Sequence, residues 1–178
     1  GTLDATTVSA TGVLGGTGNI TGDTTIATDG ALSPGNSTGT LNVENLTMAD
    51  GADYVWEFAS STDTDTTAVS GALEFLAEDI DADVDITLVP IGNAVILAGD
   101  TVTLFTYDSV TGLGDVSWNI TYGGGSGTWT LQNPTFSDTG SAITLSGVEF
   151  VPEPASLVLL ALGAMTLLGR RRARRNCN

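Results

Sequence analysis

Carboxylates are the side chains of this sequence with the clearest capacity for chemistry, and one segment concentrates them. After Glu78, acidic and apolar residues alternate from residue 79 to residue 86. On a β-strand this alternation places four carboxylates on one face: Asp79, Asp81, Asp83 and Asp85. The four carboxylates of such a row repel one another, and a bound calcium ion could relieve this repulsion. The sequence does not match the EF-hand calcium-binding loop, however, because Val84 replaces the required Gly and Pro90 occupies the position of the bidentate ligand. We therefore predict a solvated strand face and no metal site.

Paired carboxylates can also hydrolyse glycosidic bonds, which some β-helix enzymes do. The chain has 21 acidic residues, and the sequence alone cannot select a pair at the required separation. It has neither His nor Lys, so the usual bases of Ser and Cys hydrolases are missing. Cys177 is the one Cys of the chain, so an intrachain disulfide and a Cys-ligated metal site are both excluded. We predict no enzymatic activity, no catalytic residue and no cofactor; the alternative is a carboxylate-dependent carbohydrate-active enzyme on a β-helix.

The cationic side chains occupy a single short segment at the C-terminus. They are Arg170, Arg171, Arg172, Arg174 and Arg175. All but one of the 21 acidic residues lie in residues 1–150, which contain no cationic side chain. This body cannot bind nucleic acid through its phosphates, because it has no charge that could replace their counterions.

The elements that carry these residues are predicted to be β-strands. Thr, Val and Gly are abundant, and alternating segments are expected to form strands at 100–107, 116–122, 127–131 and 142–146. Residues 123–127 are expected to form a hairpin-like loop. We predict that residues 96–150 form a β-sheet cap on the repeats that precede them.

Residues 1–95 carry a spacing of 20–21 residues. Asp29-Gly30 is followed by Asp50-Gly51, Ser70-Gly71 and Gly92-Asn93, and aligning the first two units places Ile20 on Leu41 and Asp23 on Glu44. This period is the size of one coil of a parallel β-helix or related solenoid. The chain also begins in apparent mid-repeat, from which we expect an incomplete or processed chain.

The repeat region resembles a known family. Residues 12–22, followed by Leu32-Ser33-Pro34-Gly35-Asn36-Ser37, are similar to the autotransporter-associated β-strand repeat of bacterial surface proteins. The resemblance covers about residues 12–58. It implies a right-handed parallel β-helix of the passenger type.

The C-terminal segment differs from the body in composition. Val151-Pro152-Glu153-Pro154 is followed by the uncharged residues 155–169, which as a helix cover about 22 Å. We predict a transmembrane helix over 155–169, anchored by Ala155, Leu157, Leu160, Leu162, Leu167 and Leu168. The Arg cluster behind it is expected to stay in the cytoplasm. The alternative is a buried C-terminal helix of a globular protein.

The order of these parts over residues 151–175 resembles the PEP-CTERM sorting signal of Gram-negative bacteria, a segment also catalogued as the C-terminal domain of ice-binding proteins. The resemblance implies export, a transient anchor in the inner membrane, recognition of Pro152-Glu153-Pro154 by an exosortase, and release to the cell surface or matrix. Thr101 with Thr103, and Thr128 with Thr130, do not recur at the coil spacing, so we expect ordinary strand threonines.

Together these observations predict an exported bacterial surface or extracellular-matrix protein with a structural or adhesive role. The predicted fold is all-β: a right-handed parallel β-helix over 1–95, a β-rich cap over 96–150, and a sorting signal with one hydrophobic helix over 151–175. The predicted partners are an exosortase, the membrane and an exopolysaccharide.

Overall fold

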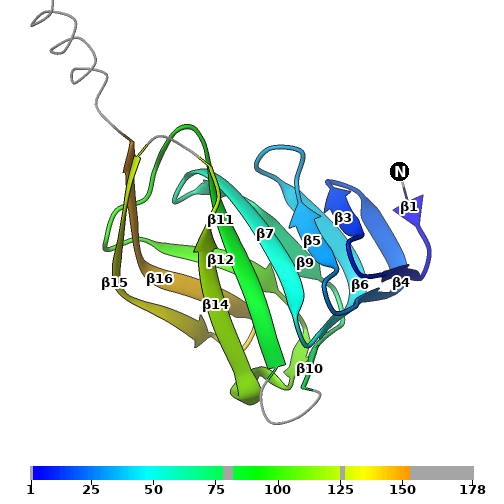
Figure 1. Ribbon diagram of the computed structural model, residues 1–178. Coiled ribbons are helices and arrows are strands. Elements are labelled where there is room, and N and C mark those ends of the chain that lie inside the picture. The colour runs from blue at the N-terminus through cyan, green and yellow to red at the C-terminus, as the bar shows by residue number, and fades with distance from the viewer. Residues whose placement is uncertain (1, 78–81, 125–126, 153–178) are drawn as a thin grey trace, which may run out of the picture.

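The computed structural model describes residues 2–77, 82–124 and 127–152, and most of these residues lie in β-strands (Figure 1). The all-β prediction is confirmed, and no α-helix occurs in the described ranges. The strands are β1 (Thr2–Leu3), β2 (Thr6–Val8), β3 (Val13–Gly16), β4 (Asn19–Ile26), β5 (Ala31–Pro34), β6 (Thr40–Ala49), β7 (Ala52–Ser60), β8 (Asp63–Thr64), β9 (Thr66–Val69), β10 (Ala72–Leu76), β11 (Ala82–Val95), β12 (Thr101–Thr106), β13 (Ser109–Thr111), β14 (Val116–Tyr122), β15 (Gly127–Asp138) and β16 (Ala142–Pro152). A 3₁₀ turn, η1 (Leu113–Asp115), precedes β14.

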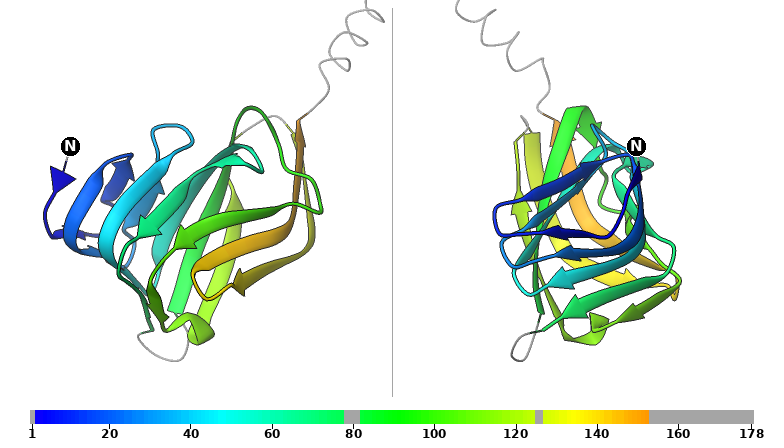
Figure 2. Two further views of the ribbon diagram at one scale, coloured as in Figure 1. Left: turned by 180° about the vertical axis from the view of Figure 1, so that it is seen from behind. Right: turned by 90° about the vertical axis from the view of Figure 1, so that its right-hand side faces the viewer.

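The strands form two sheets, and the chain passes from one sheet to the other as it advances. One sheet has the order β1-β4-β6-β9-β12-β16-β15, and the other has the order β14-β11-β7-β5-β3. Most neighbours within each sheet run parallel, and the antiparallel exceptions are β7 with β8, β12 with β16, and β15 with β16. The end-on view in Figure 2 shows the strands of the two sheets on opposite sides of a shared interior.

The parallel register differs in detail from the predicted repeat. In the second sheet Val13 pairs with Ala31, Ala31 with Asp53, Asp53 with Asp85, and Asp85 with Asn119. The distance in sequence between partners therefore grows along the chain instead of staying at 20–21 residues. In the first sheet Ile20 pairs with Val43 and Asp23 with Asn45, so the predicted alignments are displaced by two residues and by one. The strands of the second sheet lengthen from four residues in β3 and β5 to nine in β7 and 14 in β11, and a fixed spacing of Gly-containing turns cannot record that change.

Side-chain alternation predicted the later strands well, although it could not give their partners. Residues 116–122 form β14 over the predicted range. β12, at 101–106, lies within the predicted range 100–107, whereas β15 and β16 extend beyond the predicted ranges 127–131 and 142–146. β14 pairs with β11, whereas β15 pairs with β16, and no pairing joins β14 to β15 among the described residues. The expected hairpin across residues 123–127 is therefore wrong. The strands of residues 96–150 extend both sheets.

The interior is filled by side chains from alternate positions of each strand, and β7 contributes the largest. Tyr54, Trp56 and Phe58 are fully buried, because a period of two turns all three inward. The Tyr54 hydroxyl donates to the carbonyl oxygen of Leu104 at 2.9 Å, on a strand of the opposite sheet. The Trp56 Nε1 donates to the carbonyl oxygen of Asp65 at 2.8 Å. These bonds satisfy the polar atoms that the aromatic core would otherwise bury without partners.

One carboxylate is buried in the same region. Asp65 is 0% exposed, and its two oxygens accept hydrogen bonds from the backbone N–H groups of Gly39, at 3.0 Å, and Glu57, at 2.9 Å. Asp65 thereby joins the loop after β5 to β7. Burial raises the pKa of Asp65 to about 7, the two N–H donors act in the opposite direction, and the charge of Glu57 adds to the rise.

The predicted hydrophobic helix at 155–169 lies outside the described residues. Within the described ranges, no helix is long and apolar enough to cross a membrane. The last described strand, β16, ends at Pro152 inside the predicted sorting motif. Its final residues, Val151 and Pro152, pair with Thr128 and Gly127 of β15.

Candidate functional site

β14 and β15 end the two sheets on the same side of the molecule, and aromatic side chains fill the space between them. Trp118 of β14 stacks on Phe136 of β15, with ring centroids 4.6 Å apart and an angle of 13° between the planes. Further along the same two strands, the ring centroids of Tyr122 and Trp129 are 4.5 Å apart, with an angle of 32° between the ring planes. These contacts hold together two edge strands that share no backbone ladder, so packing of aromatic surface is what closes the interior here.

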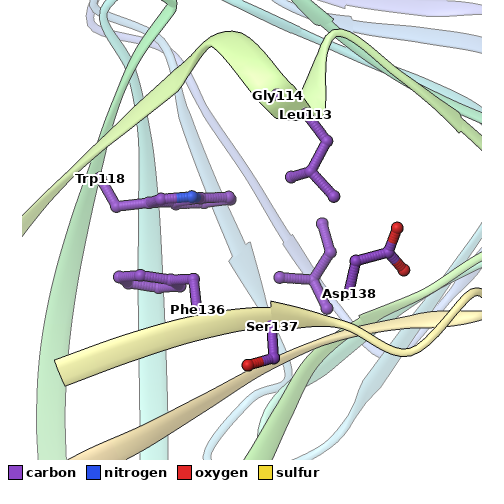
Figure 3. Close-up of a pocket in the computed structure, with 7 residues that line it drawn as sticks. Leu113, Gly114, Trp118, Phe136, Ser137 and Asp138 are labelled. Atoms are coloured by element: carbon purple, nitrogen blue, oxygen red, sulfur yellow. The ribbon is translucent and has the colours of Figure 1, made fainter.

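A pocket of about 360 Å³ opens beside the Trp118–Phe136 pair (Figure 3). Its lining residues come from η1, β14, β15 and β16: Leu113, Gly114, Trp118, Phe136, Ser137, Asp138 and Ile143. Figure 3 shows the two rings lying parallel, with Leu113 and Asp138 beyond one end of the stack. The Ser137 hydroxyl points to the opposite side of β15 from the Asp138 carboxylate, as expected for neighbours on a strand.

Asp138 is the ionisable group of this pocket, and the protein holds it by one oxygen. Its Oδ1 accepts a short hydrogen bond from the Tyr107 hydroxyl and a second, at 2.6 Å, from the backbone N–H of Gly140. These two donors lower the pKa of Asp138 below its usual value, so the carboxylate is ionised at neutral pH. The pKa of Tyr107 rises to about 12, first through burial and then through its bond to Asp138, so the phenol remains a donor.

This arrangement can bind a small ligand. Leu113, Ile143 and the aromatic pair supply apolar walls, and Asp138 supplies one fixed acceptor. Pockets that bind small ligands combine an apolar lining with a few placed polar groups in this way. Glycoside hydrolysis requires a second carboxyl group as its partner. Among the described lining residues Asp138 is the only carboxylate, and its lowered pKa is opposite to what a general acid needs.

The structure places the predicted acidic row only in part. Asp79 and Asp81 lie outside the described residues, whereas Asp83 is exposed and Asp85 is half-buried on β11. Asp85 pairs directly with Asp53 of β7, and burial together with the charges of Asp85 and Asp29 raises the pKa of Asp53. In the part of the chain that the structure describes, no three His, Cys, Asp or Glu residues are arranged to hold a metal ion. Asp85 of this row therefore repels Asp53 across the two strands.

The paired threonines lie on two separate strands of the same sheet. Thr101 and Thr103 are on β12, and Thr128 and Thr130 are on β15. β16 lies between these two strands and pairs with both. The threonine pairs are therefore not adjacent, and they do not build a continuous ladder of hydroxyl groups.

The sorting residues stand at the boundary of the described structure. Val151 is exposed, at 42%, and Pro152 is the last residue of β16. The other predicted residues of this segment lie outside the described ranges: Glu153, Pro154, Ala155, Leu157, Leu160, Leu162, Leu167, Leu168 and the cluster Arg170, Arg171, Arg172, Arg174 and Arg175.

Sequence reasoning missed the pocket entirely. Trp118 and Phe136 lie on strands that belong to different sheets, so nothing in the local pattern brings them together. One signal was available. In a chain with only 6% aromatic residues, β14 and β15 together carry two of the three Trp, which indicates a special environment for these strands.

Comparison with known proteins bears on the C-terminal segment alone. Residues 150–175 match the model of the PEP-CTERM protein-sorting motif. No curated protein matches the chain. The motif covers too little of the sequence to assign the body to a family. It does indicate where the protein is sent, because it marks the chain for exosortase-dependent export toward the cell surface.

Proposed function

We propose that this protein is a non-catalytic, glycan-binding component of the bacterial cell surface or extracellular matrix. The observation that carries the proposal is the pocket beside Trp118 and Phe136, which combines apolar walls with a single ionised carboxylate. Saccharide rings present C–H faces that pack on apolar and aromatic walls, and hydroxyl groups that donate to a carboxylate. The sorting motif supports the location, because it directs export toward the surface.

The body would act as a rigid support for this pocket. We infer that successive parallel strands are coils of a right-handed β-helix, and that residues 12–58 are an autotransporter-associated β-strand repeat. The support is the alternation of the chain between two largely parallel sheets. The adhesive role would be to hold exopolysaccharide after transient anchoring in the inner membrane and release by an exosortase.

A variant that fills the pocket tests glycan binding. Gly114 lines the pocket, and a Cβ added there meets no atom within 4 Å, so the backbone accepts a side chain at this position and we expect the ring of Gly114→Phe to obstruct the pocket. Gly99 has the same open surroundings in the loop between β11 and β12, which makes Gly99→Phe the matched control. On a panel of neutral and charged oligosaccharides, we expect Gly114→Phe to lose binding and Gly99→Phe to keep it. Equal binding by both variants would refute the site.

The same panel separates binding from catalysis. We expect no release of reducing ends from any bound oligosaccharide, because Asp138 has no carboxyl partner among the described lining residues. Turnover would instead support the carbohydrate-active enzyme.

The sorting role is tested by substitution inside the motif. Glu153→Ala should leave uncleaved protein in the membrane fraction, whereas Glu44→Ala, at an exposed position of β6, should be processed normally. Normal processing of Glu153→Ala would refute the assignment of Pro152-Glu153-Pro154 as the recognised residues.

A further inference from the structure

The pocket carries a charge preference that goes beyond glycan binding in general. Both hydrogen bonds that the structure gives to the Asp138 carboxylate end on Oδ1, one from Tyr107 and one from Gly140. Oδ2 has no such bond within the described ranges. The carboxylate is thus fixed in orientation by the protein while one of its oxygens remains available. A ligand that meets this oxygen must bring a hydrogen-bond donor, and a charged donor makes the stronger bond.

The surrounding charge acts in the same direction. Residues 1–150 contain no cationic side chain, so no group of the body could neutralise an anionic ligand. Asp115, next to Gly114 of the lining, and Asp108, next to Tyr107, are both exposed and add negative charge on this side of the molecule. The field at the pocket therefore attracts cations and repels uronic acids and sulfated sugars.

The remaining walls restrict the kind of cation. Leu113, Ile143 and the Trp118–Phe136 pair present apolar surface around a volume of about 360 Å³, which lies at the lower end of the range of small-ligand pockets. A bare metal ion would leave these walls without contact. A pyranose ring that carries an ammonium group offers both an apolar face for the walls and a charged donor for Oδ2.

We propose that the pocket binds a hexosamine unit with a free amino group, as found in a de-N-acetylated polysaccharide. The ammonium group donates to Oδ2 of Asp138, and the ring packs between Leu113, Ile143 and the aromatic pair. This inference rests on the proposed glycan-binding function and adds its specificity. Acetylation of the amine removes the charge, and the pocket then binds the sugar through its apolar face and a neutral donor alone.

The test compares trisaccharides that differ at one group. The full chain, kept in a neutral detergent, is titrated calorimetrically at about pH 6 with a glucosamine trimer, its N-acetylated form, cellotriose and a glucuronic acid trimer. Because Asp138 is exposed and solvent screens its charge, we expect the glucosamine trimer to bind about threefold more tightly than the acetylated and neutral sugars. We expect no binding of the glucuronic acid trimer.

Two isosteric variants separate the pocket from the general acidity of the body. Asp138→Asn retains an oxygen for the Tyr107 and Gly140 donors and removes the charge, so the threefold preference should be lost. Asp4→Asn makes the same change in net charge near β1, at the opposite end of the molecule from β15, and should keep the preference (Figure 1). If both variants behave alike, the preference comes from the overall charge and the assignment to Asp138 fails.

The remaining outcomes distinguish this inference from the function beneath it. Equal affinity for the glucosamine, acetylated and neutral trimers would overturn the amine preference and leave glycan binding in place. Absence of binding to every sugar would overturn both. A lysine-containing peptide that binds as tightly as the glucosamine trimer, with the same loss in Asp138→Asn, would show that the pocket recognises an ammonium group on a peptide and would overturn the hexosamine assignment.

Discussion

The stability of this protein should fall as pH rises through neutrality, and the buried carboxyl of Asp65 is the reason. In the folded state its pKa is about 7, whereas the ordinary value of an aspartate is 3.8. Between these two values the folded chain holds a proton that the unfolded chain has released. The stabilisation is therefore fully present below about pH 4 and is lost as pH rises toward and through 7.

The size of the effect follows from the difference between the two pKa values. A shift of about three units corresponds to about 4 kcal/mol in the free energy of unfolding. For a chain of this length, that change corresponds to a fall of about 8–16 °C in Tm between acidic and alkaline conditions. The pKa of about 7 already includes the hydrogen bonds from Gly39 and Glu57, which lower the pKa of Asp65 and so oppose the effect of burial.

The matched variant is Asp65→Asn. It cannot ionise. Gly39 and Glu57 donate to different oxygens of Asp65, so the NH2 group of the amide leaves one of these two donors without its acceptor. At about pH 4 the variant should therefore be less stable than the parent by about 1–3 kcal/mol. Between about pH 4 and about pH 9 the difference should shift by up to about 4 kcal/mol in favour of the variant.

The assay is thermal unfolding followed by circular dichroism across this pH range, in constant salt. The repulsion among the many other carboxylates lowers stability with rising pH in both chains, so only the difference between them reports on Asp65. Parallel curves for parent and variant would refute the reasoning. They would mean that Asp65 titrates alike in the folded and unfolded states.

Three further predictions concern single positions. Gly35 has φ 88°, and a Cβ there would overlap both the Ser37 carbonyl oxygen and Asp65 Oδ1, so Gly35→Ala should lower the free energy of unfolding by at least about 2 kcal/mol in chemical denaturation. Gly92 also has a positive φ but lies in open space, so Gly92→Ala should lower it by less. Equal losses in the two variants would show that the overlap at Gly35 is relieved. Thr24 buries a hydroxyl that has no hydrogen-bond partner within the described ranges, so Thr24→Val should raise the free energy of unfolding by about 1 kcal/mol. A lower free energy of unfolding in the variant would indicate that the Thr24 hydroxyl is hydrogen-bonded. Tyr107→Phe removes a donor to Asp138, so the pKa of that carboxyl should move up toward its ordinary value in an NMR titration, and an unchanged pKa would contradict the role of the phenol.

The sequence predicted local structure better than it predicted partners. Strand β14 coincides with its predicted range because its alternation is unbroken, and export follows from a motif that is read linearly. The pairing of Ile20 with Val43 could not be predicted, because a bulge between residues 20 and 23 adds one of the two residues that separate Val43 from the expected partner Leu41. Asp65 stands in a run of alternating Asp and Thr that reads as solvated surface, yet the chain buries it against β7. Such burial depends on contacts between distant strands.

The end of β16 has a consequence for the order of events during secretion. Residues 150–152 belong both to the matched sorting motif and to β16, which is hydrogen-bonded to β15. The folded body and the sorting motif therefore overlap, with no linker between them. Under the exosortase cleavage proposed above, the enzyme would compete with β15 for the backbone groups of these residues. Cleavage would then either precede the pairing of β16 with β15 or require that this pairing first be broken.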